Sequence, residues 1–272
     1  MILDTNQELF IRISVFAGLF LIMMVWEWLS PGRQAGNNLW PRRGNNLLLV
    51  ILNNLMLRFV LPMTAVGMAI RAVYEGWGIL TVYSISLPAS IVISLIVFDL
   101  AMYLQHVMFH KIPVLWHLHR VHHIDEDLDT STGLRFHPLE IAISMLIRIM
   151  IVVVLGAPAL AVMLFELILN ACALFNHGNV YIAPGIDKWL RWLIVTPDMH
   201  RVHHSSYRDE IDSNYGFNLS CWDRIFGTYR EKPRDGHLKM RIGMTEFSGK
   251  ITVNTLWLLL NPFMSPTENN KD

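Results

Sequence analysis

Residues 86–110 read SLPASIVISLIVFDLAMYLQHVMFH, an apolar run that ends in two histidines. A helix needs about 20 apolar residues to cross the hydrocarbon core of a bilayer, and Ser86 to Phe109 is long enough. His106 and His110 are four residues apart, so they lie on one face of this helix, where two imidazoles can bind one metal ion. The stretch therefore predicts a membrane-spanning helix whose last turns carry metal ligands.

Other apolar runs of similar length predict further spans, at Leu9 to Leu29, Leu47 to Ile70, Leu139 to Leu155 and Pro158 to Phe175. The last two are separated by a break at Gly156 and Ala157, which is short enough to require a tight helical hairpin. We therefore expect an all-α integral membrane protein with about four to five transmembrane helices.

Composition agrees with a membrane protein. Charged residues make up 16% of the 272-residue chain and apolar residues 53%, whereas a soluble domain carries about a quarter charged residues. Lys plus Arg number 22 against 22 Asp plus Glu, so we expect no nucleic-acid partner. Cys172 and Cys221 are far apart, which excludes a disulfide framework and a CxxC metal site. The acidic start, with Asp4 and Glu8, is unlike a cleaved signal peptide, so the first run is expected to stay in the mature protein.

The distribution of basic residues predicts the orientation in the membrane. The segment from Ser30 to Asn46 carries Arg33, Arg42 and Arg43 and no acid, which places it in the cytoplasm and the N-terminus outside. Counting crossings then puts residues 110–138 and everything after 176 on the cytoplasmic side. These two regions hold most of the histidines, so we expect a cytoplasmic helical cap that carries them.

Two shorter apolar stretches, Trp189 to Val195 and Ile251 to Leu260, are too short to span a bilayer. They carry Trp near Lys or Arg, which favours helices that lie in the membrane interface.

The pattern HRVHH occurs twice, at residues 119–123 and 200–204. Each copy offers three imidazoles at helical spacing, and with HVMFH the three boxes supply His106, His110, His119, His122, His123, His200, His203 and His204. Eight imidazoles are too many for one ion and enough for most of the shells of two. The alternative is a group of surface histidines or a weak zinc-buffering loop. His117, which lies in no metallo-hydrolase HxHxDH box, and the isolated His237 are expected to be non-ligands.

Nitrogen ligands alone do not identify the metal, because imidazole suits zinc, copper, iron and nickel. The three boxes, with RFHPLE at 135–140 and NYGFNLSCWDRIFGTY at 214–229, resemble the fatty acid hydroxylase and sterol desaturase superfamily. The arrangement looks most similar to bacterial sterol-desaturase-like members and to alkylglycerol monooxygenases. The resemblance covers about residues 98 to 230.

The resemblance implies a membrane-bound oxidoreductase with two non-haem irons. Such an enzyme uses O2 and an external electron donor, a protein of the ferredoxin or cytochrome b5 type, to hydroxylate or desaturate a lipid of the bilayer. The substrate would be a sterol-like, fatty acyl or ether lipid. The implied location is a bacterial inner membrane, or the endoplasmic reticulum in a eukaryote, with the active site on the cytoplasmic face.

The resemblance carries the ligand role to the eight histidines of the boxes. It also implies His177 and His137 as ligands, with a hydrogen-bonded supporting role as the alternative for each. In domain terms it suggests N-terminal transmembrane helices over 1–85, an oxygenase domain over 86–230 and a tail with an interfacial helix over 231–272.

Two rival functions can be stated from the same residues. A histidine-rich metal transporter would need ionisable residues along a pathway at the membrane midplane, where these histidines are almost absent. A zinc-dependent lipid hydrolase would need an open site with a carboxylate base, and the chain contains no HExxH.

Ionisable residues within the apolar runs predict two ion pairs. Arg148 and Glu166 lie at equal distances from the turn of the hairpin, so antiparallel helices should place them at the same depth and pair them. Asp99 is expected to pair with Arg58 of the second run, which lies at a similar depth.

Overall fold

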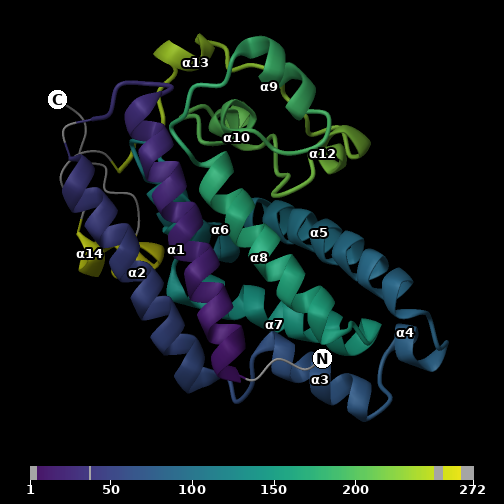
Figure 1. Ribbon diagram of the computed structural model, residues 1–272. Coiled ribbons are helices and arrows are strands. Elements are labelled where there is room, and N and C mark those ends of the chain that lie inside the picture. Colours follow the sequence, from purple (N-terminus) through teal and green to yellow (C-terminus); the bar gives the residue numbers. More distant parts are fainter. Residues whose placement is uncertain (1–4, 37, 248–253, 265–272) are drawn as a thin grey trace.

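The computed structural model describes residues 5–36, 38–247 and 254–264, and within them the chain is helical apart from loops and isolated β-bridges. Figure 1 shows a layer of long helices with a smaller group of short helices at one end. The helices of the long layer are α1 (Thr5–Leu29), α2 (Leu39–Val60), α3 (Ala65–Tyr74), α4 (Ile79–Val82), α5 (Leu87–Lys111), α7 (Pro138–Leu155) and α8 (Ala159–Asn176).

Within the described residues, five segments are long and apolar enough to cross a membrane. They coincide with α1, α2 to α4, α5, α7 and α8. The all-α membrane fold expected from the sequence is therefore confirmed. The predicted second span, Leu47 to Ile70, has the wrong boundaries. The helix begins at Leu39 and ends at Val60, because Leu61 is extended and the following Pro62 has no N–H to donate.

The hairpin between α7 and α8 is as tight as its sequence predicts. Gly156 ends α7 in the left-handed region, with φ of 71°, where glycine carries no penalty. A Cβ at Gly78, which precedes α4, would lie 2.1 Å from the backbone nitrogen of Gly156. The two backbones therefore approach as closely as they do because both positions lack side chains.

Inside the membrane layer one predicted ion pair is confirmed and one is wrong. Arg148 donates to Glu166 at 2.9 Å, and Arg12 of α1 reaches the other carboxylate oxygen at 2.6 Å. Asp99 instead accepts hydrogen bonds from Trp222 Nε1 at 2.7 Å and from the backbone N–H of Leu219 at 3.3 Å. Arg58 is exposed, and no ion pair between it and Asp99 is present among the described residues.

The short helices form a cap over one end of the membrane layer (Figure 1). They are α6 (Pro113–His123), η1 (Thr130–Leu134), α9 (Pro184–Leu190), α10 (Pro197–His203), α11 (Arg208–Ile211), α12 (Cys221–Ile225) and α13 (Gly236–Lys239), while α14 (Thr255–Leu260) and η3 (Asn261–Phe263) lie beside α2 and α6. Arg33 donates to the carbonyls of His237 and Met240 at 3.0 and 2.9 Å. The loop after α1 therefore belongs to the same end as the cap, and the polar regions share one face as expected.

The interfacial helices differ from their predicted bounds. α9 ends at Leu190, and a turn containing the exposed Trp192 and Leu193 follows it. In the predicted stretch from Ile251 to Leu260, residues 251–253 lie outside the described part, and α14 begins at Thr255.

We expect Glu166→Gln to lower the free energy of unfolding by about 3 kcal/mol, because it leaves the half-buried guanidinium of Arg148 without a carboxylate and Arg12 with Glu8 alone. Glu8→Gln is the matched control. It removes only the partly exposed partner of Arg12 at 2.8 Å, and its cost should stay below about 1 kcal/mol. Unfolding in mixed detergent micelles measures both, and equal losses would contradict the buried pair.

Candidate metal centre

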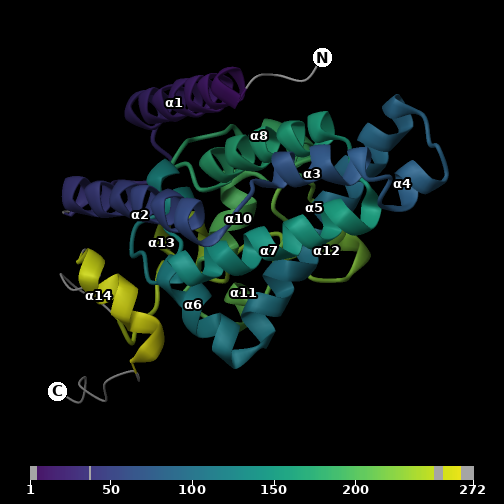
Figure 2. The same cartoon turned by 90° about the horizontal axis from the view of Figure 1, so that it is seen from below.

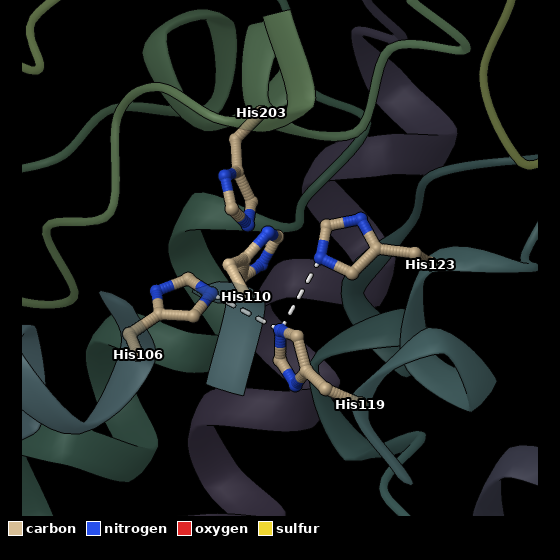
Figure 3. Close-up of side chains that lie close together, drawn as sticks. All are labelled: His106, His110, His119, His123 and His203. Carbon is tan, nitrogen blue, oxygen red and sulfur yellow. Dashed lines mark hydrogen bonds between the residues drawn. The ribbon is translucent and has the colours of Figure 1, made fainter. Parts of the chain in front are cut away.

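Nine histidines form two buried clusters beneath the cap, and within each cluster one nitrogen per residue lies within 4.8 Å of the others. The first cluster contains His106, His110, His119, His123 and His203, which Figure 3 shows converging from three directions. The second contains His122, His177, His200 and His204. None of the nine is more than 5% exposed. Such a density of imidazole without solvent requires a chemical explanation.

The two HRVHH boxes each divide their histidines between the clusters. On α6, His119 and His123 point into the first cluster, while His122 points into the second. On α10 the assignment is reversed, because His200 and His204 join the second cluster and His203 joins the first. Residues four apart lie on nearly the same side of a helix, whereas the residue just before the second of them points to a different side. Each short helix therefore contributes to both clusters.

Hydrogen bonds to Nδ1 fix the tautomers of five of these histidines. The Nδ1–H groups of His106, His122, His177 and His203 donate to backbone carbonyls, those of Tyr215, Arg135, Ala173 and Ser213, at 2.7 to 3.2 Å. That of His119 donates to Glu140 Oε1 at 2.6 Å. A neutral imidazole that donates from Nδ1 presents a lone pair at Nε2. All five lone pairs are directed into the clusters.

Facing nitrogens lie at the separation of two ligands on one metal ion. The Nε2 atoms of His122 and His177 are 3.0 Å apart, and those of His106 and His119 are 3.1 Å apart (Figure 3). Two lone pairs cannot hydrogen-bond to each other, so these contacts are repulsive unless a cation lies between them. Imidazoles bound at about 2.1 Å and at right angles would place their nitrogens about 3 Å apart. The residues present therefore fit metal ions.

Burial keeps the imidazoles of the cap neutral. It lowers the pKa of His177 to about 4 and the pKa of His203 to about 3. Burial, and then the neighbouring histidines, lower the pKa of His122, His200 and His204 well below the usual value. Metal binding needs the neutral form, so these histidines are ready to bind at physiological pH.

Several ring nitrogens have no other partner. Both nitrogens of His204 and the Nε2 atoms of His110 and His203 are buried without a hydrogen bond in the described part of the chain, and Nδ1 of His110 has only Asp212 Oδ1 at 3.5 Å. Buried polar atoms are almost always satisfied. Coordination of a metal is the interaction that satisfies several converging imidazole nitrogens at once.

The other three histidines of the chain lie outside both clusters. His137 was expected as a ligand, but it caps α7: its Nδ1 accepts from the N–H of Leu139 at 3.2 Å and its Nε2 donates to the carbonyl of Leu259 at 3.1 Å. With both nitrogens engaged, it has no lone pair for a metal. His117 is exposed on the outer face of α6. His237 belongs to neither cluster.

The residues that support the clusters were not found from the sequence. Asp223 accepts from the backbone N–H groups of Tyr215 and Gly216 at 2.7 and 2.8 Å and from the hydroxyl of Thr228 at 2.7 Å. These bonds hold the carbonyl of Tyr215 against His106. Asp223 is the one carboxylate of the motif at 214–229, but only the fold shows which backbone N–H groups it holds.

A buried charge network supports the second cluster. Arg42 pairs with Asp125 at 2.8 Å and with Asp129, and Arg43 pairs with Asp129 and Glu27 at 2.9 Å. These arginines lie in the first turns of α2, within the segment that the sequence presented as a basic loop. Glu27 of α1 accepts from the backbone N–H groups that begin η1 and follow His177, those of Thr130 and Asn179. The network thus ties α1 and α2 to the backbone around the cluster.

We expect His203→Ala to remove at least one equivalent of bound metal, because a buried shell that loses one imidazole has no replacement nearby. Glu140→Gln should reduce metal affinity less completely, by roughly 10- to 100-fold, since the amide can still accept from His119 but carries no charge. His117→Ala is the control and should leave metal content unchanged. Metal analysis of purified protein measures all three, and full metal content in His203→Ala would contradict the site.

Several known proteins are similar in sequence to the part of this chain that carries the histidine clusters. The chain is 30% identical to an ornithine lipid hydroxylase of Rhizobium tropici over 64% of this chain and 50% of that protein. It is 35% identical to the human alkylglycerol monooxygenase over 48% of this chain and 28% of that protein. It is 28% identical to a Delta(7)-sterol-C5(6)-desaturase of Nicotiana tabacum over 54% of this chain and 52% of that protein.

The matches thus span about half or less of these relatives' own lengths. No solved structure matches the chain. The model of the fatty acid hydroxylase family matches residues 91–228, about half of the chain, and this range includes all nine clustered histidines. The chain therefore belongs to the fatty acid hydroxylase family.

Proposed function

We propose that the protein is a membrane-bound oxidoreductase that uses O2 and a pair of non-haem irons to hydroxylate an unactivated C–H bond of a lipid. The observation that carries the proposal is the pair of histidine clusters, five and four imidazoles, with lone pairs facing at the separation of metal ligands. Iron is favoured over zinc because imidazole tolerates both of its oxidation states, and because the relatives named above are a hydroxylase, a monooxygenase and a desaturase.

Bound iron would supply the oxidising power that no side chain has, since a C–H bond resists acid, base and nucleophile. The chain supplies the rest. Burial beneath α6, α10 and the loop at 214–229 excludes water from both clusters. In five of the nine histidines a hydrogen bond from Nδ1 directs Nε2 into the cluster and holds the ring in one orientation.

The position of the clusters suits a substrate dissolved in the bilayer. His106 and His110 end the apolar helix α5, and His177 ends α8. The ligands therefore lie at the level where membrane spans meet the cap. A lipid that remains in the bilayer can present its chain or its headgroup-proximal carbons there without leaving the membrane.

Hydroxylation and desaturation share the first hydrogen abstraction, and the proposal favours hydroxylation. Two of the relatives named above, the hydroxylase and the monooxygenase, are named for insertion of oxygen. The electrons are proposed to come from an external carrier of the ferredoxin or cytochrome b5 type, because the reduction of O2 needs two electrons beyond those of the substrate.

The rival functions fit the geometry less well. A metal transporter needs ligands along a path across the membrane, whereas the two clusters lie at one end of it. A zinc hydrolase needs an open coordination site beside a carboxylate base. Here Glu140, beside the first cluster, is buried and already accepts from His119. Asp212, beside His110, already pairs with Lys111 and Arg208.

The decisive experiment is expression in cells whose lipids are then extracted and weighed by mass spectrometry. We expect lipids that have gained one oxygen atom, purified protein with about two irons, and O2 consumption that depends on an added reductant. The His203→Ala variant should lose all three. A product that lacks two hydrogens instead would replace hydroxylation with desaturation, and zinc-loaded protein that hydrolyses lipid esters would reject oxidation altogether.

We also propose that the cap faces the cytoplasm, because the loop with Arg33 shares its end of the molecule. Single cysteines can be placed at the exposed positions Ala35, beside the cap, and Glu75, after α3 at the other end, in a variant that lacks Cys172 and Cys221. An impermeant maleimide on intact cells should label only Glu75→Cys. Labelling of only Ala35→Cys would reverse the orientation and leave the chemistry unaffected.

A further inference from the structure

A cavity of about 400 Å³ lies outside the metal clusters, where α1 ends and α2 begins. Its walls include Glu27 and Trp28 of α1, Arg33 of the following loop, Trp40 of α2, and Asp127 of the segment before η1. Figure 2 shows α1 at the edge of the bundle, and its main packing partners are α8 and η1. The cavity therefore lies between the end of α1 and the start of α2, which the ion pair of Glu27 and Arg43 links.

The depth of the cavity is that of lipid headgroups. Two apolar spans end at its walls, and Trp28 and Trp40 beside it are 80% and 72% exposed. Tryptophan concentrates where the hydrocarbon core of a bilayer meets its polar headgroups. A molecule that enters between these two side chains thus comes from the headgroup layer on the cap side of the membrane.

Most charges in the cavity wall are satisfied by one another. The carboxylate of Glu27 accepts from Arg43, Thr130 and Asn179, and Asp129 pairs with Arg42 and Arg43 of α2. These groups have no capacity left for a strongly held ligand. One nitrogen, Nε of Arg42, is buried beside them without a partner in the described residues.

One cation and one anion of the wall differ from the rest. The guanidinium of Arg33 donates only to two backbone carbonyls, and Asp127 accepts from the N–H of Gly36 at 3.1 Å. Neither has an ion-pair partner within 4.0 Å in the part of the chain that the structure describes. Burial, and then the nearby Arg201, lower the pKa of Arg33 against the attraction of Asp127, and burial raises the pKa of Asp127 against the attraction of Arg42. Each charge is thus compensated only in part, by groups farther away than an ion pair.

We propose that this cavity binds the headgroup of a zwitterionic phospholipid with a primary ammonium group, whose phosphate meets Arg33 and whose ammonium meets Asp127. Charge-assisted hydrogen bonds to phosphate and from ammonium are the interactions that compensate these two groups. An anionic headgroup would satisfy Arg33 and leave Asp127 beside a second negative charge. The bound lipid braces α1 against α2, a role that depends on neither metal nor O2.

The test uses the full-length protein in nanodiscs that contain dioleoyl phosphatidylethanolamine, phosphatidylglycerol and phosphatidylcholine in equal amounts. After transfer to detergent, native mass spectrometry counts the lipids that stay bound. We expect phosphatidylethanolamine to be retained about tenfold over the other two, the ratio that one charged hydrogen bond supports.

Asp127→Asn keeps an acceptor for Gly36 and should make retention of phosphatidylethanolamine and phosphatidylglycerol equal. Arg33→Gln should lower the retention of all three lipids. Glu231→Gln removes an exposed carboxylate that does not line the cavity and should change nothing. Thermal unfolding of each variant in lipid-free detergent shows whether the fold is kept.

A second measurement needs no variant. In wild-type protein, stepwise N-methylation of the lipid from the primary to the quaternary amine should reduce retention at each step. Equal retention along that series, or a preference for phosphatidylethanolamine that persists in Asp127→Asn, would overturn the proposal. So would displacement of the lipid by inorganic phosphate alone, which would reveal a simple anion site. None of these measurements depends on oxidation of a lipid. A negative result would therefore reject the lipid site without rejecting the proposed enzyme activity.

Discussion

The cap depends on holding neutral imidazoles in direct contact with one another. The Nε2 atoms of His122 and His177 are an example. Both rings donate from Nδ1 to carbonyls, so both direct lone pairs at each other across 3.0 Å. The chain must hold such pairs together until a cation makes them attractive. It does so in part by placing an acceptor behind five of the nine rings, and the loops around the clusters bring several of those acceptors into place.

Different kinds of interaction stabilise the two ends of the molecule. At the cap end, carboxylates such as Asp223 and Asp129 organise backbone N–H groups and arginines, so loops without regular structure become rigid. At the opposite end, the close approach of Gly78 to Gly156 packs backbone against backbone. Glu166, which bridges Arg12 and Arg148, then links α1 to the hairpin. Polar interactions thus position the ligands, while the apolar helices supply a frame of fixed spacing.

The sequence predicted those features of the structure that depend on residues close together in the chain or related by one turn. The spans, the hairpin, the Arg148–Glu166 pair and the helical spacing of the histidine boxes all depend on residues near one another in the chain or related by one turn. The partner of Asp99 was predicted wrongly, because it comes from Trp222 in the cap and not from a neighbouring span. The sequence also did not predict that each HRVHH box divides its histidines between two clusters, because this division depends on how α6 and α10 face each other. His137 sits in a motif like the others, and only its two hydrogen bonds reveal a capping role.

The exchange of histidines between α6 and α10 has a consequence for how the protein is made. The first cluster lacks a member until His203 has been synthesised, and the second lacks two until His200 and His204 have been. Every long helix, through α8, precedes those residues in the chain. Neither centre can therefore be complete before the whole set of long helices has been synthesised, and the completion of both depends on α10 and the residue that follows it.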